Sequence, residues 1–229
     1  MLVAIMFVGF AVLVISYKWR KSQVKVPVVY EVPKEVIEQR DAEKRAVRWL
    51  VEREVRLKDH FREIDPDDFA RQPHVSVVHV EFLSADQVTV ESISRVKILS
   101  GLRTVSFYDT PIKDEHTALI AELTNVPELN LNFTEVTDAG LAKLALLPDL
   151  SILRLNGTHV TDEGLSLLRG SKLHTLSLFD TAVTDNGLAE LGKLPQLLML
   201  DVQKTGVTPE GVSRFRESRA RCFIYSDPY

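Results

Sequence analysis

A string of eight residues recurs at a nearly constant interval along the second half of the chain. It reads TEVTDAGL from Thr134, THVTDEGL from Thr158 and TAVTDNGL from Thr181. The same frame extends to Thr110 and Thr205, so that successive threonines lie 24, 24, 23 and 24 residues apart. A catalytic motif is needed once, whereas a building block recurs. A fixed period of about 24 residues therefore predicts a solenoid of stacked units.

Each repeat contains a short strand pattern followed by a helical pattern. Segments such as LSILRL and LHTLSL precede the threonine, and their last two leucines lie two residues apart, which is the strand period. Segments such as GLAKLALL and GLAELGKL follow it, with apolar residues at helical spacing. We therefore predict a strand, a turn and a short helix in every unit, which places the chain in the α/β class.

The apolar positions of the repeat are expected to form a core that neighbouring units share. In one unit, the side chains that should point into the stack are Leu153, Leu155, Val160, Leu165 and Leu168. Burial of each such side chain stabilises the fold by about 1.5–3 kcal/mol. A single unit cannot cover these side chains by itself, so the neighbouring units must do so.

The polar positions of the repeat also have structural interpretations. The threonine after the strand can hydrogen-bond the backbone of the turn. Thr161 with Asp162 supplies an N-cap and a negative charge at the start of the helix. Gly164 allows close backbone packing or eases the first helical turn. We therefore interpret the recurring Thr–Asp pair as part of the scaffold and not as a catalytic dyad.

These units resemble leucine-rich repeats, and in particular the bacterial variety in which T-x-V-T-D-x-G-L replaces the usual Asn-containing segment. The resemblance covers residues 102–212, and degenerate units lie at both ends of a repeat domain that we assign to residues 73–229. It implies a short right-handed horseshoe with a parallel β-sheet on its concave face. The whole chain also resembles, more loosely, a family of short membrane-attached bacterial proteins.

The first 17 residues suggest a membrane anchor. Residues 1–15, MLVAIMFVGFAVLVI, carry no charge, and 17 residues span about 25 Å as a helix, which is the short end of a bilayer span. Tyr17 and Trp19 occupy interfacial positions, and a basic flank follows. We predict a transmembrane helix over residues 1–17 and not a cleaved signal peptide, because no basic segment precedes the apolar run. The positive-inside rule then places the repeats in the cytoplasm.

Residues 18–72 are expected to join this anchor to the repeats. The stretch from Pro33 to Ile64 is rich in Glu, Lys and Arg and contains no internal Gly or Pro, which predicts one long, exposed juxtamembrane helix. Its apolar spacing is interrupted at Glu54, so the pattern is too short for a coiled coil. The segment DPDD, which starts at Asp65, should end the helix.

Composition and motifs argue against several classes of function. Residues 73–229 hold 14 Lys or Arg and 20 Asp or Glu, so their net charge of −6 argues against a nucleic-acid surface. Cys222 is the only cysteine, so neither an intramolecular disulfide nor a thiolate zinc site is expected. No G-x-S-x-G, phosphate-binding glycine loop or H-E-x-x-H motif is present, and the six histidines are scattered. We therefore predict a non-enzyme without catalytic residues, metal, cofactor or small-molecule substrate.

The outward-facing side chains of the predicted sheet are the remaining candidates for a binding site. Strand alternation and the resemblance place them in three columns on the concave face. The first column holds residues 104, 128, 152, 175 and 199, the second 106, 130, 154, 177 and 201, and the third 108, 132, 156, 179 and 203. Aromatic, Met and Arg residues among amides are typical of protein-binding surfaces. The candidate binding residues are Tyr108, Asn130, Asn132, Ile152, Arg154, Asn156, Phe179, Met199, Asp201 and Gln203. Phe223 and Tyr225 should extend the sheet at its C-terminal end.

The sequence therefore predicts a membrane-anchored leucine-rich repeat protein that binds a protein partner without catalysis. A structural repeat protein without a dedicated ligand is an alternative. A further alternative is a substrate adaptor in protein turnover, as in F-box proteins with related repeats. The segment between Pro33 and Ile64 is too highly charged to resemble an F-box.

Overall fold

The computed structural model describes residues 3–8, 11–19, 25–30, 34–59, 62–71 and 76–227. The chain divides into two compact units, Met1–Arg45 and Ala46–Tyr229. The repeat domain expected from residue 73 lies within the second unit. That unit begins 27 residues earlier than the sequence boundary, because the segment after Ala46 contributes to its core.

The first unit contains an antiparallel three-stranded sheet in the order β1-β2-β3. Its strands are β1 (Val3–Val8), β2 (Ala11–Trp19) and β3 (Lys25–Tyr30). The apolar run predicted to be a transmembrane helix thus forms two paired strands. It is rich in Val and Ile, whose branched side chains favour strands over helices, and apolarity alone does not distinguish the two.

The membrane topology predicted from the sequence is therefore wrong. Among the described residues, no helix combines the length and the apolar character that crossing a bilayer requires. The single-pass anchor over residues 1–17 is contradicted, and the cytoplasmic placement that depended on it loses its basis.

The charged helix is also shorter than predicted. Helix α1 spans Lys34–Val51 and is followed by a turn in which Glu54 has a positive φ of 60°. Strand β4 (Arg56–Lys58) then pairs antiparallel with the first strand of the repeats, and Leu57 is 1% exposed. The apolar residues that sequence spacing assigned to one helix stripe therefore belong partly to this strand, which closes the end of the sheet.

The second unit contains an eight-stranded sheet in the order β11-β10-β9-β8-β7-β6-β5-β4, with all neighbours parallel except β4 and β5. Three-residue strands recur once in each repeat, as the sequence predicts. After β4 they are β5 (His79–Glu81), β6 (Thr104–Ser106), β7 (Glu128–Asn130), β8 (Ile152–Arg154), β9 (Thr175–Ser177), β10 (Met199–Asp201) and β11 (Phe223–Tyr225).

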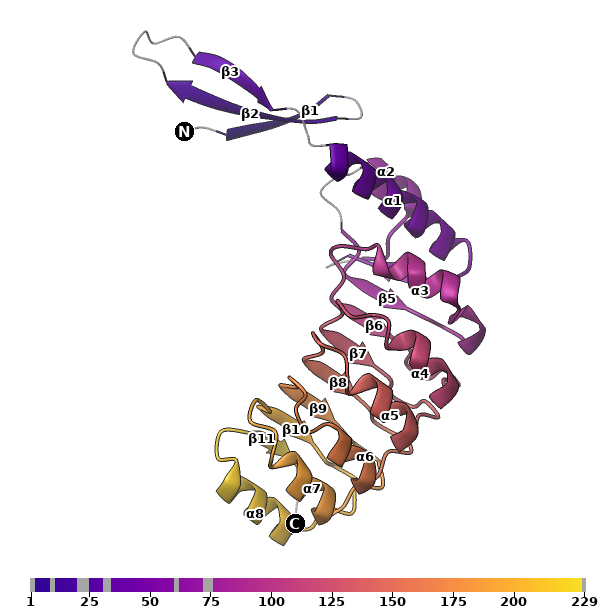
Figure 1. Cartoon of the computed structure of the whole chain (residues 1–229), viewed down its shortest axis with the longest axis vertical. Helices are drawn as coiled ribbons and strands as arrows, with labels where there is room; N and C mark the ends of the chain where they lie inside the picture. Colours follow the sequence, from indigo (N-terminus) through magenta and orange to yellow (C-terminus); the bar gives the residue numbers. More distant parts are fainter. Residues whose placement is uncertain are drawn as a thin grey trace. The chain divides into compact units, whose positions relative to one another are not determined.

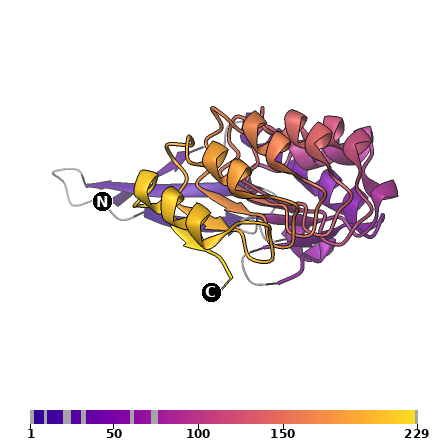
Figure 2. The ribbon, with the colours of Figure 1, turned by 90° about the horizontal axis from the view of Figure 1, so that it is seen from below.

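The helices of the repeats form a second layer beside the sheet (Figures 1 and 2). Within this unit the strands line the inner side of the arc and the helices line its outer side (Figure 1). The elements are α2 (Pro66–Arg71), the 3-10 turn η1 (Ala85–Gln87), α3 (Val90–Lys97), α4 (Asp114–Ile120), α5 (Asp138–Leu144), α6 (Asp162–Leu167), α7 (Asp185–Leu191) and α8 (Pro209–Ser218).

The space between the two layers is filled by the apolar positions of the repeat. Leu153, Leu155 and Val160 are fully buried, and Leu165 is 1% exposed. The equivalent residues of the neighbouring units belong to the same continuous core. The inward phase predicted from the sequence is confirmed.

The Thr–Asp pair of the motif joins one unit to the next. Thr161 caps α6 by accepting a hydrogen bond from the backbone N–H of Glu163, as predicted. Its own backbone N–H and hydroxyl donate to the two carboxylate oxygens of Asp138, one repeat earlier, at 2.8 and 2.6 Å. In residues 114–208 this joint recurs in the pairs Thr137–Asp114, Thr161–Asp138, Thr184–Asp162 and Thr208–Asp185.

The glycine of the motif makes room for the same joint. A Cβ atom at Gly164 would overlap the Asp138 carboxylate, and one at Gly187 would overlap that of Asp162. The string T-D-x-G-L therefore encodes a cap, a carboxylate for the next unit and a space for the carboxylate of the previous unit. Its repetition is explained by stacking.

Candidate functional site

The first two columns of candidate residues lie side by side on the inner face of the sheet. The register pairs Ile152 with Glu128 on one side and with Thr175 on the other, and Thr175 with Met199. Arg154 is paired in the same way with Asn130. Phe223 and Tyr225 extend the two columns through the pairing of β11 with β10, as predicted.

The third column lies just beyond the strands, where backbone hydrogen bonds continue from unit to unit. Asn132 is only 8% exposed, and its side-chain oxygen accepts from the backbone N–H of Asn156 at 2.9 Å. The Asn156 side-chain oxygen in turn accepts from the N–H of Phe179 at 2.9 Å. These two predicted binding residues therefore serve the scaffold, because their amides satisfy the backbone of the neighbouring unit.

Several polar candidates on the sheet are also engaged within the chain. The side-chain oxygen of Asn130 accepts from the N–H of Asn132, and that of Asp201 accepts from the N–H of Gln203. Arg154 forms an ion pair with Glu128, with Nε and Oε1 3.0 Å apart. Asn132 is buried, whereas the other residues in these contacts are partly exposed. They therefore form part of the surface and also stabilise its conformation.

Apolar side chains are exposed at the C-terminal end of the inner face. Met199 is 41%, Phe223 74% and Tyr225 52% exposed, and Ile152 is half-buried. Leu198, which precedes β10, is 49% exposed and was not among the predicted residues. It occupies the first x of the L-x-x-L-x-L pattern, a position that the three predicted columns did not include.

A second group of exposed aromatic residues lies where β6 and β7 lead into their turns. Tyr108 is 48% exposed, and its ring meets that of Phe133 edge-on, with the centroids 5.5 Å apart. Phe179, in the equivalent position two units after Asn132, is half-buried, and the Lys204 ammonium lies 4.8 Å from its ring centroid. Phe133 was not predicted as a site residue, because strand alternation does not extend into the turn.

The N-terminal end of the inner face is charged. Glu81 forms ion pairs with Lys58 at 3.2 Å and with Arg56 at 3.7 Å. His79 lies beside them, and burial followed by the nearby Lys58 lowers its pKa, against the opposing effect of Glu81 and Glu128. Opposite charges are thus paired here, in contrast to the apolar surface at the other end of the sheet.

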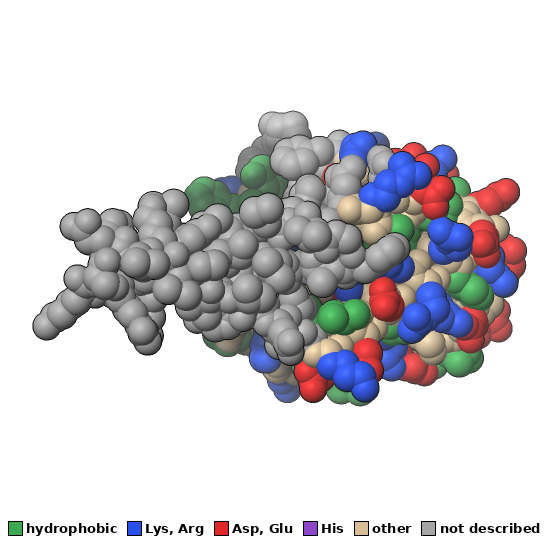
Figure 3. Space-filling view, turned by 90° about the horizontal axis from the view of Figure 1, so that it is seen from above, with side chains coloured by type: hydrophobic (Ala, Val, Ile, Leu, Met, Phe, Trp, Pro, Cys, Tyr) green, Lys and Arg blue, Asp and Glu red, His purple; other side chains and the backbone are tan. Residues whose placement is uncertain are grey.

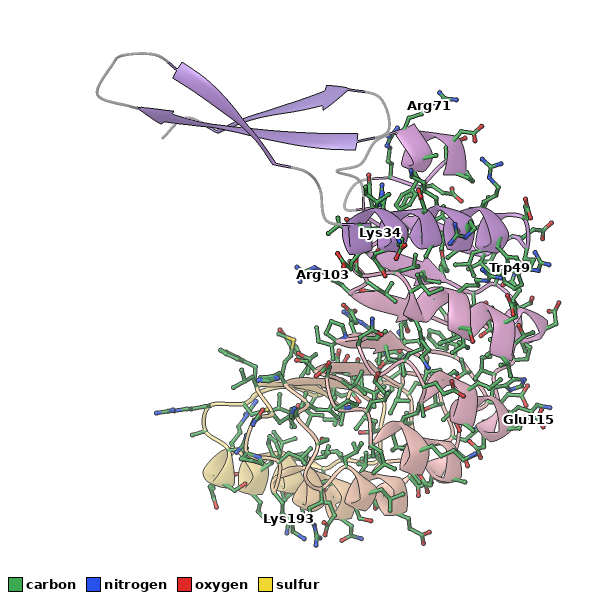
Figure 4. All side chains as sticks on the ribbon, turned by 45° about the horizontal axis from the view of Figure 1, so that its top comes forward. Lys34, Trp49, Arg71, Arg103, Glu115 and Lys193 are labelled. Carbon is green, nitrogen blue, oxygen red and sulfur yellow. The ribbon has the colours of Figure 1, made fainter. Side chains whose placement is uncertain are left out.

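The helix side of the unit carries mixed charges. On the part shown in colour in Figure 3, basic and acidic side chains are interspersed. Glu115 and Lys193 point outward from this layer (Figure 4). In the basic segment RFRESRAR, Arg214 pairs with Asp185 at 2.9 Å, and Arg219 donates to backbone carbonyls of residues 195 and 197. Through these contacts the segment, residues 214–221, is held against its own helix layer.

A hollow of about 420 Å³ lies near the first repeat and is lined by residues that include Trp49, Arg53, Gln87 and Ser92. The guanidinium of Arg53 stacks on the Trp49 ring at 3.7 Å, and the Gln87 amide donates to the Arg53 carbonyl at 2.8 Å. The buried Ser92 hydroxyl contacts the Gln87 carbonyl at 2.6 Å. These interactions stabilise the turn after α1.

Across the described residues, no cluster of three or more His, Cys, Asp or Glu is arranged to hold a metal ion.

Comparison with known proteins identifies the repeat. The family model described as Leucine Rich repeat matches residues 122–145 and 147–168, and no curated protein matches the chain. Among solved structures, an internalin (inlF) from Listeria monocytogenes is similar, with 18% identity, a TM-score of 0.37, and coverage of 59% of this chain and 50% of that one. The Arabidopsis receptor kinase HAESA, in complex with the peptide hormone IDA and the co-receptor SERK1, shows 16% identity, a TM-score of 0.40, and coverage of 66% and 26%.

This chain therefore spans half of the internalin chain and 26% of the receptor-kinase chain. The matched segments contain α5 and α6 with the strands before them. Together with the alternation of short parallel strands and helices, the match shows that this chain carries leucine-rich repeats.

Proposed function

We propose that the repeat unit is a non-catalytic scaffold that binds a protein partner on the inner face of its parallel sheet. The observation that carries this proposal is the row of exposed apolar side chains at its C-terminal end, where Met199, Phe223 and Tyr225 lie on paired strands. Aromatic and Met side chains are enriched at protein interfaces, and large aromatic rings supply contact area at a low cost in conformational entropy. We assign the repeats to the T-x-V-T-D-x-G-L variety within the same proposal.

The surrounding charges favour a protein over a nucleic acid. Residues 73–229 have a net charge of −6, which would repel a phosphate backbone. Arg154, on the same face, is already paired with Glu128. Of the predicted candidates, Ile152, Met199, Tyr108 and the half-buried Phe179 offer apolar contact area, whereas Asn132 and Asn156 are retained only as supports.

The proposal is tested by photo-crosslinking in the cells that produce the protein natively. A photoreactive residue is placed at Met199, which is exposed on the inner face, and a matched one at Lys193, which is exposed on the helix side. We expect one specific protein adduct from position 199 and none from position 193. Met199 is preferred to Phe179 as the labelled position, because a substitution of Phe179 would also remove its contact with Lys204.

Equal, diffuse labelling at the two positions would contradict the proposal. It would favour the alternative that the repeats are structural and have no dedicated ligand. A specific adduct at position 193 alone would move the binding surface to the helix layer.

A further inference from the structure

Tyr108 and Phe133 form an exposed aromatic corner at the ends of β6 and β7. Their rings meet edge-on with centroids 5.5 Å apart, and both side chains are more than two-fifths exposed. A Cβ atom at Gly157 would overlap the Phe133 ring, so this ring extends across the turn of the following unit. The absence of a side chain at Gly157 therefore leaves room for the Phe133 ring, which stays 43% exposed.

The backbone at Phe133 has an unusual conformation for an aromatic residue. It has a positive φ of 58°, and the same position of each turn is left-handed at Asp109, Gly157, Asp180 and Lys204. Gly and Asp adopt this conformation readily, whereas a bulky residue does so under strain. Strained residues that stay exposed often mark functional sites. The Phe133 side chain nevertheless remains 43% exposed in this conformation.

Carboxylates occur in this row on both sides of the ring. Asp109 lies one unit before Phe133 and Asp180 two units after it, and both are exposed. The adjacent turns are joined by the hydrogen bond from the N–H of Asp109 to the carbonyl of Asn132. The cation of the same row, Lys204, is placed over Phe179. The row therefore presents negative charge and a partly exposed aromatic ring together.

We propose that this corner binds a cationic side chain, arginine or lysine, from the protein partner. A cation over an aromatic face within about 6 Å is attracted by the ring quadrupole, and nearby carboxylates add charge-assisted hydrogen bonds. This inference rests on the proposed function and specifies the chemistry of the partner: a basic residue at the turn edge beside apolar contacts on the sheet.

The test uses the full chain and two capped pentapeptides, Gly-Gly-Arg-Gly-Gly and the same peptide with citrulline, which has the shape of arginine without its charge. Binding is followed by NMR through the amide signal of Gly157 and the ring protons of Tyr108. We expect saturable shifts with the arginine peptide and binding weaker by about tenfold with citrulline, which equals loss of one charge-assisted contact. Phe133→Asn should abolish the shifts, since asparagine tolerates the left-handed backbone but offers no ring.

The matched control is Leu167→Asn, because Leu167 on the helix layer is 45% exposed compared with 43% for Phe133. It should leave arginine binding unchanged. Asp180→Asn is a second variant that retains the ring and should weaken binding by about threefold, as for one exposed charge. Equal binding of citrulline, or arginine binding that survives Phe133→Asn, would overturn the inference.

Crosslinking at Met199 separates this inference from the proposed function. A specific adduct at position 199 with no preference for arginine over citrulline would reject only the cationic corner. A preference for arginine that depends on Phe133, with diffuse crosslinking at position 199, would instead reject the sheet face as the binding surface.

Discussion

A threonine hydroxyl closes the turn after each of the strands β6 to β10. The Thr158 hydroxyl donates to the Leu155 carbonyl at 2.6 Å, and the side chain is only 4% exposed. Thr110, Thr134 and Thr181 donate in the same way to the carbonyl three residues earlier. The hydrogen bond from the threonine to the turn backbone, which the sequence predicts, is therefore confirmed.

Thr158→Val should lower the free energy of unfolding by about 1 kcal/mol, because it removes the shorter of two hydrogen bonds to the Leu155 carbonyl and leaves only the one from the Thr158 backbone N–H at 3.3 Å. Urea denaturation of the full chain measures the change, and Thr158→Ser, which keeps the hydroxyl, is the control. A valine variant as stable as the wild type would show that the hydroxyl contributes nothing to the turn.

Gly157 is constrained by its backbone and by its neighbour. Its φ is 63°, and a side chain would meet the Phe133 ring. Gly157→Ala should therefore cost about 1–2 kcal/mol of stability from the left-handed backbone alone, and more from the overlap. In a Phe133→Asn background the overlap disappears, so the same substitution should cost less there. Thermal melts of the wild type, the two single variants and the double variant measure this coupling, and additive effects would refute the contact.

At the scale of elements, the joint between units is a carboxylate held by the next helix cap. At the last joint, burial acts to raise the pKa of Asp185, but hydrogen bonds from the Thr208 backbone and hydroxyl, with the Arg214 guanidinium, lower it overall. The ionised carboxylate is the form that accepts these bonds. The helices are short, with six to ten residues in α4 to α8, so their alignment depends on such joints as well as on packing.

Gly187→Ala should destabilise the stack by about 1–3 kcal/mol, because the new methyl group overlaps the Asp162 carboxylate and contacts Leu165. Asp162→Ala removes the carboxylate that the methyl group would meet. The double variant should therefore be more stable than the sum of the single effects predicts. Chemical denaturation measures the free energy of unfolding of all three variants. Strictly additive effects would show that Gly187 does not make room for the Asp162 carboxylate.

The stability of the fold should depend on pH through His79, the first residue of β5. Its pKa lies below the usual value near 6.5, because of burial and then the Lys58 charge, with Glu81 and Glu128 opposing. The unfolded chain therefore binds a proton at His79 more readily than the folded chain does. The stability that neutral His79 contributes is complete above the unfolded pKa and is lost as the pH falls through the folded pKa. His79→Gln should reduce the fall in melting temperature between pH 7 and about pH 5. An unchanged pH profile in that variant would exclude this role.

At the scale of the whole unit, one continuous apolar core runs through the stacked repeats. Leu155 is fully buried in its middle. Each repeat covers the apolar side chains of its neighbouring repeats, so stability is shared along the stack. A defect in the central unit therefore removes the cover of the units on both sides.

Leu155→Asp should unfold the whole repeat unit, since it buries a charge without a partner. Circular dichroism should show loss of the cooperative transition, and limited proteolysis should cut throughout residues 46–229. Protection of all repeats except the one around Leu155 would contradict a single cooperative stack.

The sequence alone determined the features that depend on local spacing. The period of 24 and the strand and helix patterns predicted the stacked α/β units, and the alternation at Leu153 and Leu155 predicted which side chains face the core. The threonine caps followed from the preferences of helix ends. Each of these follows from interactions within one unit, and five successive copies in the chain reinforce the same pattern.

Only the tertiary structure decided features that depend on contacts outside a residue's own strand or turn. The amides of Asn132 and Asn156 hold the backbone of the next unit, so they are supports, and Phe133 faces solvent from a left-handed turn. The apolar run before residue 17 pairs strand to strand, which apolarity alone does not distinguish from a helix. The physical reason is that contacts made only in the folded chain determine which polar groups are engaged and which apolar groups remain exposed.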